Sequence, residues 1–479
     1  MQDKLDNLDI IDCDFIGDLA RQYGLPLHIY FVERMAANAR GFKEVARRLY
    51  PNTLVAFSVK TNPCRGAIRA VAGMDLGVDV GSEYEFQAAL EENIAPEKII
   101  CNGNAKSDYY LKMSMEKDAL IAADSAEEIR LLNKMAGSAG LKARVLVRFT
   151  GMPLEGFTAP DQSTASNWTK FGFAAAQADE IFRSFENYPH VKFVGISAHI
   201  GTQICNPLAY HLLFNHFWEL ILLAKKLGLK TRYINIGGGY PVRFVSESEW
   251  KEFTRRLREQ LSDQKGAHEC ITWNNLPMGY GHLKGKHPTE SDPWVGKAYW
   301  SAFPQAAMLE NLLNHADDEG ITVREKMESI GSPTLIIEPG RSMIATAGVT
   351  VTKVMSTKMA LGNNIVALDM GINNHGTNLI TPDIFPAEVI PPRADDQPCE
   401  AFLVGRLCFS GDLINKAKVK LNRLPVRDEL MVIHHTGAYS ADHFASHSCG
   451  FPRPAKVAVR SDGTIEIWRR VETYHDVFS

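Results

Sequence analysis

The amino-acid sequence predicts an α/β protein, a (β/α)8 barrel of the TIM type with a second, all-β domain. Three observations predict this architecture. Eight short apolar runs alternate with longer amphipathic segments through the first two thirds of the chain. After Arg341 the pattern changes to alternating β-type runs separated by Gly, Pro and Asn. The length of 479 residues also exceeds what one compact core usually holds, so two domains are expected.

The eight apolar runs are the predicted barrel strands. Most are continuous rather than alternating, as expected for strands that are covered on both faces. Amphipathic segments such as Ser82–Glu92, Ser125–Ala136 and Pro207–Leu227 separate them, and this repeated alternation favours a parallel barrel. The runs are Leu54–Val59, Leu76–Val80, Ile99–Cys101, Leu120–Ala122, Val145–Arg148, Phe193–Ser197, Tyr233–Ile236 and Leu335–Ile337.

The stretch 262–331 interrupts this rhythm between the seventh and eighth runs. It is rich in Gly, Pro and aromatic residues and contains an amphipathic helix near Ala306–Ala316. Long loops on a barrel rim often act as lids or specificity elements, but an oligomer contact or a plain loop is an equal alternative. We therefore treat 262–331 as an insertion whose role stays open.

The predicted second domain begins after the barrel. We also assign to it the early β-type run Leu27–Phe31. The predicted barrel domain therefore covers 32–344, including the insertion, and the β-rich domain combines 1–31 with 345–479. The later runs are Val349–Val354, Ile365–Met370, Ala401–Val404, Glu429–Ile433, Val457–Val459 and Ile465–Trp468.

Composition excludes several classes of function. The formal net charge of −4 offers no global attraction for nucleic acid or for an acidic membrane. The eight cysteines include no CxxC pair, so we expect no metal site. The N-terminus is acidic and lacks the apolar region of a signal peptide, and no apolar run is long enough to span a bilayer. We therefore expect a cytoplasmic protein with reduced thiols.

Polar or glycine residues directly follow several of the predicted strands. Lys60 follows the first run, His199 the sixth, Gly237–Gly239 the seventh and Glu338 the eighth. Because the carboxyl ends of barrel strands meet at one rim, residues that are far apart in the sequence converge there. The sequence therefore predicts one site that combines an amine, an imidazole, a glycine turn and a carboxylate.

Each of these residues has both a chemical and a simpler structural explanation. A desolvated amine such as that of Lys60 can form a Schiff base, but a lysine at a strand end often only reaches solvent. His199 can stack on a cofactor ring or serve packing. The amides of Gly237–Gly239 can wrap a phosphate, although glycine turns without a ligand are common. Glu338 can hold a cationic ring nitrogen and Arg341 a phosphate or carboxylate, or the two can form an internal ion pair.

Two further segments lie in the predicted β domain. Leu407–Asp412 contains Cys408, and a free cysteine is usually a buried small side chain without chemistry. Thr436–Tyr439 places a phenol beside small residues, and buried tyrosines commonly serve packing. Neither segment alone indicates a reaction.

In this order, however, the motifs together resemble those of a known family. The match also includes Gly103–Ser107, Ala123–Ser125 and Lys170–Gly172, and it extends from about Leu27 to Val459 apart from the insertion. The sequence resembles the fold-type III decarboxylases that use pyridoxal 5'-phosphate, the group of the ornithine, diaminopimelate and arginine decarboxylases. The resemblance implies pyridoxal phosphate as the cofactor and a second domain like the C-terminal domain of alanine racemase.

The resemblance also implies roles for residues at the predicted rim. Lys60 forms the Schiff base with the cofactor, His199 stacks on the pyridine ring, and Glu338 pairs with the pyridine nitrogen. A carboxylate there keeps that nitrogen protonated, so the ring accepts electrons when CO2 departs. The other residues that the resemblance places near the cofactor are Asp79, Thr202, Gly237, Gly238, Gly239, Arg341 and Tyr439.

Cys408 is implied as the proton donor to the carbanion that remains after CO2 leaves. Together with Lys60, His199 and Glu338 it completes the expected catalytic set. In the family this cysteine reaches the site from the partner subunit. The resemblance therefore implies a homodimer with active sites at its interface.

The departures from the family pattern concern the substrate. Diaminopimelate decarboxylases carry Cys-Glu-Ser-Gly-Asp where this sequence has Phe409 in place of the glutamate, and Arg-Pro-x-x-Tyr where it reads Thr381–Phe385. We therefore expect the substrate not to be diaminopimelate itself. Arg341 and Asp412 are candidates for a substrate carboxylate and a distal amine. Phe385 and Phe409 suggest a larger or less polar side chain.

The expected activity is therefore pyridoxal-phosphate-dependent decarboxylation of an amino acid, or of an amino-acid-bearing intermediate, through a Lys60 Schiff base and a quinonoid. A racemase is the alternative, because alanine racemases share the barrel and the β domain, although Glu338 and Cys408 argue against it. A cofactor-free regulatory homologue that binds a partner protein is less well supported, since such proteins lose catalytic groups that this chain retains.

Overall fold

The computed structural model describes residues 12–152, 164–165, 168–262, 270–276, 278, 300–376, 384–443 and 445–479. The chain forms two compact units, which are described separately. Unit 1 combines Met1–Ala37, Val242–Trp300 and Met343–Ser479, and unit 2 combines Asn38–Pro241 with Ser301–Ser342. The stretch 262–331 is thus shared between the units, and much of it lies outside the described residues. The domain boundaries inferred from the sequence stay a prediction.

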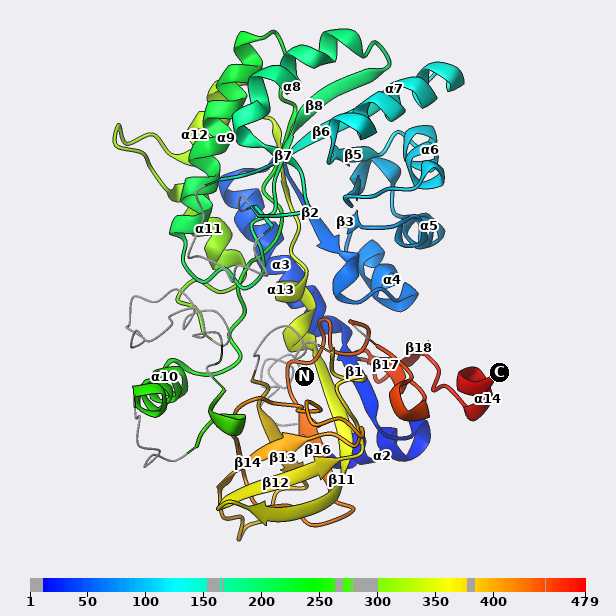
Figure 1. Ribbon diagram of the computed structural model, residues 1–479, viewed down its shortest axis with the longest axis vertical. Helices are drawn as coiled ribbons and strands as arrows, with labels where there is room; N and C mark the ends of the chain where they lie inside the picture. Colours follow the sequence, from blue (N-terminus) through cyan, green and yellow to red (C-terminus); the bar gives the residue numbers. More distant parts are fainter. Residues whose placement is uncertain are drawn as a thin grey trace. The chain divides into compact units, whose positions relative to one another are not determined.

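Unit 2 contains a closed barrel of eight parallel strands (Figure 1). The strand order is β5-β4-β3-β2-β10-β9-β8-β6, and β5 pairs with β6 to close the ring. The predicted barrel is therefore confirmed, and each predicted run overlaps one strand. The strands are β2 (Thr53–Ser58), β3 (Gly77–Val80), β4 (Ile99–Cys101), β5 (Leu120–Ala123), β6 (Ala143–Thr150), β8 (Val191–Ser197), β9 (Tyr233–Asn235) and β10 (Thr334–Ile337), and the short β7 (Phe173–Ala174) pairs with β6.

Helices follow the barrel strands. The hydroxyls of Ser82, Ser107 and Ser125 each accept a hydrogen bond from the backbone N–H three residues later, and such N-caps contribute about 1 kcal/mol each. They fix where α5, α6 and α7 begin after the loops of the rim, and Figure 1 shows these helices outside the strands. The helices of unit 2 are α4 (Arg65–Gly73), α5 (Glu83–Glu91), α6 (Asp108–Glu116), α7 (Ala126–Ala139), α8 (Ala178–Ser184), α9 (Leu208–Lys226), α11 (Ala306–Asn314) and α12 (Val323–Ser329).

Apolar side chains from six strands fill the barrel interior. All are at most 1% exposed, and burying each leucine, valine or isoleucine stabilises the fold by roughly 1.5–3 kcal/mol. The interior is therefore a packed core, and the polar groups lie at the strand ends. The core residues are Ala56, Ile100, Leu120, Leu146, Val194 and Ile336.

Unit 1 is built on a nine-stranded sheet of order β15-β14-β12-β11-β1-β17-β18, with β16 pairing β11 and β13. The predicted early strand is confirmed, because β1 (Leu27–Phe31) pairs antiparallel with β11 and parallel with β17. Two strands were not predicted from the sequence, β13 (Ala387–Ile390) and β15 (Val419–Leu421). The other strands are β11 (Gly348–Ala360), β12 (Asn363–Leu368), β14 (Cys399–Val404), β16 (Leu430–Ile433), β17 (Ala455–Val459) and β18 (Ile465–Arg469).

Helices of unit 1 are α2 (Cys13–Tyr23), α10 (Glu247–Ser262) and α14 (Tyr474–Phe478). Two others, α3 (Val32–Leu49) and α13 (Arg341–Ile344), contain the boundaries between the units. No helix among the described residues is long and apolar enough to cross a membrane.

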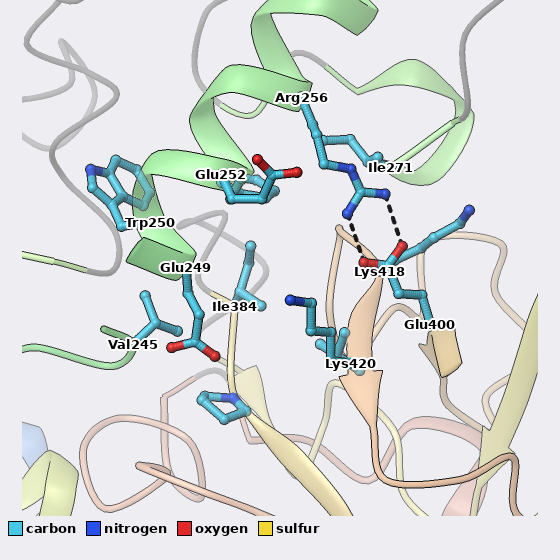
Figure 2. A pocket seen from close by; sticks show the side chains of 13 residues that line it. Val245, Glu249, Trp250, Glu252, Arg256, Ile271, Ile384, Glu400, Lys418 and Lys420 are labelled. Carbon is cyan, nitrogen blue, oxygen red and sulfur yellow. Dashed lines mark hydrogen bonds and ion pairs between the residues drawn. The ribbon is translucent and has the colours of Figure 1, made fainter. Parts of the chain in front are cut away.

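A cavity of about 140 Å³ lies within unit 1, lined by α10 and by strands of the sheet (Figure 2). Ile271, Ile384 and Trp250 contribute apolar surface to it. Arg256 of α10 donates two hydrogen bonds, of 2.7 and 2.8 Å, to the two carboxylate oxygens of Glu400. None of the site residues predicted from the sequence lines this cavity.

Candidate active site

Lys60 lies directly after β2, in a 3-10 turn formed by Val59–Thr61. Its amine donates a hydrogen bond of 2.7 Å to Oδ2 of Asp79, and the Ser58 hydroxyl donates one of 2.7 Å to the same oxygen. The Lys60 side chain is 45% exposed, whereas that of Asp79 is 2% exposed. The amine is therefore fixed in direction by a buried carboxylate, while the side chain that carries it is partly exposed.

Asp79 remains a carboxylate in this environment. Burial acts to raise its pKa, but the charge of Lys60 and the hydrogen bonds from Lys60, Asn102 and Ser58 outweigh burial and lower it. The Asn102 amide reaches Oδ1 at 2.6 Å. Asp79, predicted near the cofactor, thus contacts the predicted cofactor lysine directly.

Glu338 follows β10 and is 3% exposed. Its Oε1 accepts hydrogen bonds from the side-chain amides of Asn235 at 2.7 Å and Asn102 at 3.0 Å. Among the described residues no group donates to Oε2, so this oxygen is open to a ligand N–H. Burial, and then the charge of Asp79, raise the pKa of Glu338 to about 7. A cationic partner at Oε2 would favour the ionised form.

His199 follows β8 and is held by the glycine turn. The backbone N–H of Gly238 donates a 3.0 Å hydrogen bond to Nδ1 of His199, so a neutral ring carries its proton on Nε2. Burial, and then the charges of Lys60 and Arg148, lower the pKa of His199 to about 3. The ring is therefore a neutral, flat surface, as stacking on an aromatic cofactor requires.

The turn Gly237–Gly239 after β9 requires glycine. Gly237 and Gly239 have φ of +68° and +96°, which side chains rarely adopt. A Cβ at Gly238 would lie 2.4 Å from the carbonyl oxygen of Glu338. The N–H groups of Gly237 and Gly238 already donate to Asn235 and His199, so within this turn the N–H of Gly239 is the donor left for a phosphate.

Two more predicted cofactor residues belong to unit 2. Arg341 begins α13, three residues after Glu338, and is 7% exposed. Thr202 is half-buried in the loop after β8, three residues after His199. The alternative of an internal Glu338–Arg341 ion pair does not occur among the described contacts, and Glu338 instead accepts hydrogen bonds from amides.

Cys408, Phe409 and Tyr439 belong to unit 1, so the structure does not place them relative to Lys60. Cys408 is exposed and the Phe409 side chain is 55% exposed. Tyr439 is half-buried and has a φ of +65°, an uncommon conformation for a tyrosine. These three residues keep their predicted roles as proposals.

Phe385 and Asp412, the other predicted substrate residues, have structural partners in unit 1. Phe385 is fully buried in a core cluster and packs edge-on against His375 at 4.5 Å between ring centroids. The carboxylate of Asp412 accepts hydrogen bonds of 2.7 Å from the backbone N–H groups of Ile372 and Leu407. Both side chains therefore have a structural explanation. Thr381–Asp383 lie outside the described residues.

The sequence analysis assigned no role to Asn102, Asn235 or Arg148, although each lies at the carboxyl end of a barrel strand. Arg148 is 6% exposed, and its guanidinium carbon lies 4.2 Å from the centroid of the Phe171 ring. Its charge contributes to the low pKa of His199. The position of these three residues at the carboxyl ends of strands could have identified them, since the same criterion identified Lys60.

These residues fit pyridoxal phosphate. An accessible amine can bond to its aldehyde, and the neutral face of His199 can cover its ring. The open Oε2 of Glu338 can accept the N–H of a protonated pyridine nitrogen. The glycine turn offers the backbone N–H of Gly239 as a donor for the phosphate. The described residues contain no cluster of three or more His, Cys, Asp or Glu side chains that could hold a metal ion.

Comparison with known proteins leads to the same cofactor. Residues 37–272 match the family described as pyridoxal-dependent decarboxylase, pyridoxal binding domain. Diaminopimelate decarboxylases from Zymomonas mobilis and Vibrio cholerae are 27% and 26% identical to this chain over 461 residues each. Those alignments cover 95% of this chain and 92% and 93% of the relatives.

The fold comparison covers both units. The structure of diaminopimelate decarboxylase from M. jannaschii in complex with L-lysine matches with a TM-score of 0.75 at 22% identity, covering 96% of this chain and 93% of that one. The rim geometry fits pyridoxal phosphate, and the matched family and the relatives are named as decarboxylases. Residues 37–272 match the pyridoxal-binding domain of the pyridoxal-dependent decarboxylases, and nearly the whole chain is similar to enzymes of this kind.

Proposed function

We propose that this chain removes CO2 from an α-amino acid while Lys60 carries the cofactor. The observation behind this proposal is a continuous hydrogen-bonded series that runs from Lys60 through Asp79 and Asn102 to Glu338. It supports a single site, because it joins over short distances an amine and a carboxylate suited to opposite ends of one ring. When bound, pyridoxal phosphate supplies an aromatic system that accepts the electron pair left behind by CO2.

The chain's own residues hold protons and charges in this proposal. Glu338 keeps a proton on the ring nitrogen through Oε2, and the neutral His199 supports one face of the ring without adding charge. Asp79 directs the amine of Lys60. Arg341 binds a phosphate or a substrate carboxylate through charge-assisted hydrogen bonds. The further proposed cofactor contacts are Thr202, Gly237, Gly238, Gly239 and Tyr439.

We propose that Cys408 delivers a proton to the substrate carbon from the partner subunit of a homodimer. A free cysteine is usually among the most buried residues, whereas Cys408 is exposed in its own unit. That exposure supports a role at a surface shared with a second copy. Light scattering during gel filtration tests the dimer, and a monomer at assay concentration would contradict it.

For the substrate we propose diaminopimelate, against the expectation from the sequence. That expectation rested on Phe409 in place of a glutamate and on Thr381–Phe385 in place of Arg-Pro-x-x-Tyr, yet the Phe385 side chain is buried in a core cluster. The relatives of that name align over more than nine tenths of their length. Loss of one carboxyl group from diaminopimelate leaves lysine, the compound in the M. jannaschii complex.

The exposed ring of Phe409 favours a second candidate, an α-amino acid with a larger and less polar side chain. Release of CO2 from carboxyl-labelled diaminopimelate, ornithine, arginine, lysine and apolar amino acids compares the two. The highest kcat/KM on diaminopimelate supports the first candidate, and the highest value on an apolar amino acid supports the second. Deuterium exchange at Cα without CO2 release would make the chain a racemase instead. In every case a true activity disappears in Lys60→Ala.

A further inference from the structure

Asn102 joins two buried carboxylates that face different parts of the site. It follows β4, and its backbone N–H donates a 2.8 Å hydrogen bond to the carbonyl of Val80. Its side-chain nitrogen lies 2.6 Å from Oδ1 of Asp79 and 3.0 Å from Oε1 of Glu338. Because both neighbours are carboxylates, the nitrogen and not the oxygen of the amide faces them, with one hydrogen for each acceptor.

The two carboxylates have separate duties. Asp79 uses its other oxygen to hold the amine of Lys60 at 2.7 Å. Glu338 shares Oε1 with Asn235 at 2.7 Å and keeps Oε2 for a ring nitrogen. The only side chain among the described residues that bonds to both is Asn102. It therefore connects the end of the site that holds the amine with the end that holds the ring proton.

The chemistry of an amide suits this place. Two carboxylates close together repel each other, and burial disfavours both charges. A lysine or arginine between them would neutralise the negative charge that the ring nitrogen needs. An amide stabilises both anions with hydrogen bonds and adds no net charge. Without those bonds a buried carboxylate gains a proton more easily, and Glu338 is the more easily protonated of the two.

We propose that Asn102 is a positioning residue that holds Asp79 and Glu338 as ionised partners, so that the charge states at the lysine and at the ring nitrogen are set together. This inference rests on the proposed function, because it assumes that the cofactor ring meets Glu338. Asn235 donates to the same oxygen of Glu338, but no hydrogen bond joins it to Asp79 among the described contacts. Among the described side chains, a hydrogen-bond link between the two carboxylates is therefore specific to Asn102.

The test is the pH dependence of cofactor binding to the cofactor-free protein, measured by fluorescence titration with pyridoxal phosphate. In Asn102→Leu the amide donors are lost, whereas the number and branching of the side-chain heavy atoms stay the same. Glu338 then titrates roughly one pH unit higher, which weakens cofactor binding about tenfold near pH 6 and hardly at all near pH 9. A merely structural role would weaken binding equally at both pH values, and that result overturns the proposal.

The matched control is Asn104→Leu, the same substitution on the same loop at an exposed position. It is expected to bind the cofactor like the wild type at both pH values. Should Asn102→Leu fail to fold, Asn102→Ser takes its place, because its short hydroxyl cannot bridge both carboxylates and the same pH-dependent loss is expected. If the wild type itself does not bind the cofactor through Lys60, the proposed function fails. If it does and the variants show no pH-dependent loss, only the role of Asn102 fails.

Discussion

One added methyl group at Gly238 tests the geometry of the glycine turn. An ideal Cβ there would lie 2.4 Å from the carbonyl oxygen of Glu338 and 3.3 Å from Cε1 of His199. The first distance is far inside van der Waals contact, and its partner is a backbone atom that no side-chain rotation can move away. In Gly238→Ala either the turn or the strand end that carries Glu338 must therefore shift.

The magnitude follows from these contacts. Overpacking in a close-packed region costs typically about 1–3 kcal/mol, and a backbone partner favours the upper part of that range. A shifted turn also weakens the 3.0 Å hydrogen bond from Gly238 N–H to His199, which contributes about 0.5–1.5 kcal/mol. We expect the free energy of unfolding of Gly238→Ala to fall by about 2–4 kcal/mol. Cofactor affinity is expected to fall as well, because the shift moves the side chains of His199 and Glu338 away from their positions in the site.

Urea denaturation of the cofactor-free protein measures the stability, and titration with pyridoxal phosphate measures the affinity. The control is Gly73→Ala at the end of α4, where an ideal Cβ meets no atom within 4 Å. Alanine is the better helix former by up to about 1 kcal/mol, so this control is expected to be as stable as the wild type or slightly more so. If Gly238→Ala matched the wild type in both stability and affinity, the close approach of turn and strand would be refuted.

Three further outcomes are expected. Wild-type cofactor affinity falls as pH drops through about 7, because Glu338 gains a proton there and cannot accept a ring N–H. In fluorescence titrations Glu338→Gln is expected to show no such pH dependence, and a dependence that persists in this variant would assign the titration to another group. In urea denaturation the free energy of unfolding of Lys106→Met is expected to fall by about 3–5 kcal/mol, because the buried amine donates to Glu128 and to two backbone carbonyls at 2.7 Å. A decrease under about 1 kcal/mol would contradict this. Inactive Lys60→Ala and Cys408→Ala subunits are mixed in equal amounts and allowed to exchange. If each site uses residues of both subunits of a twofold dimer, about half of the dimers are mixed and each has one intact site, so about a quarter of wild-type CO2 release returns. No recovery would contradict shared sites.

The barrel could be predicted because its signal is local and repeated. Each strand is a short apolar run, each ends at a polar or glycine group, and parallel strands bring these ends to one rim. The contact between Lys60 and Asp79 and the one between Gly238 and His199 follow from that topology. They join neighbours on the rim that lie 19 and 39 residues apart in the chain.

Other features could not be predicted, because they depend on contacts distant in sequence. The strands β13 and β15 are only four and three residues long, and pairing with β16 and β14 defines them. Asp412 and Phe385 lie beside family motifs, but tertiary packing directs one to backbone N–H groups and the other into a core. Asn102 and Asn235 carried no signal beyond their place after strands, since an amide becomes informative only when its acceptors are known.

The most direct measurement locates the covalent link to the cofactor. Borohydride reduction of the protein loaded with pyridoxal phosphate, followed by proteolysis and mass spectrometry, fixes the cofactor on the lysine that carries it. The geometry predicts one pyridoxyl group, on the peptide that contains Lys60, and none on that peptide in Lys60→Ala. A label on a different lysine, or no label at all, would contradict a site organised around the amine of Lys60, the neutral His199 and the carboxylate of Glu338.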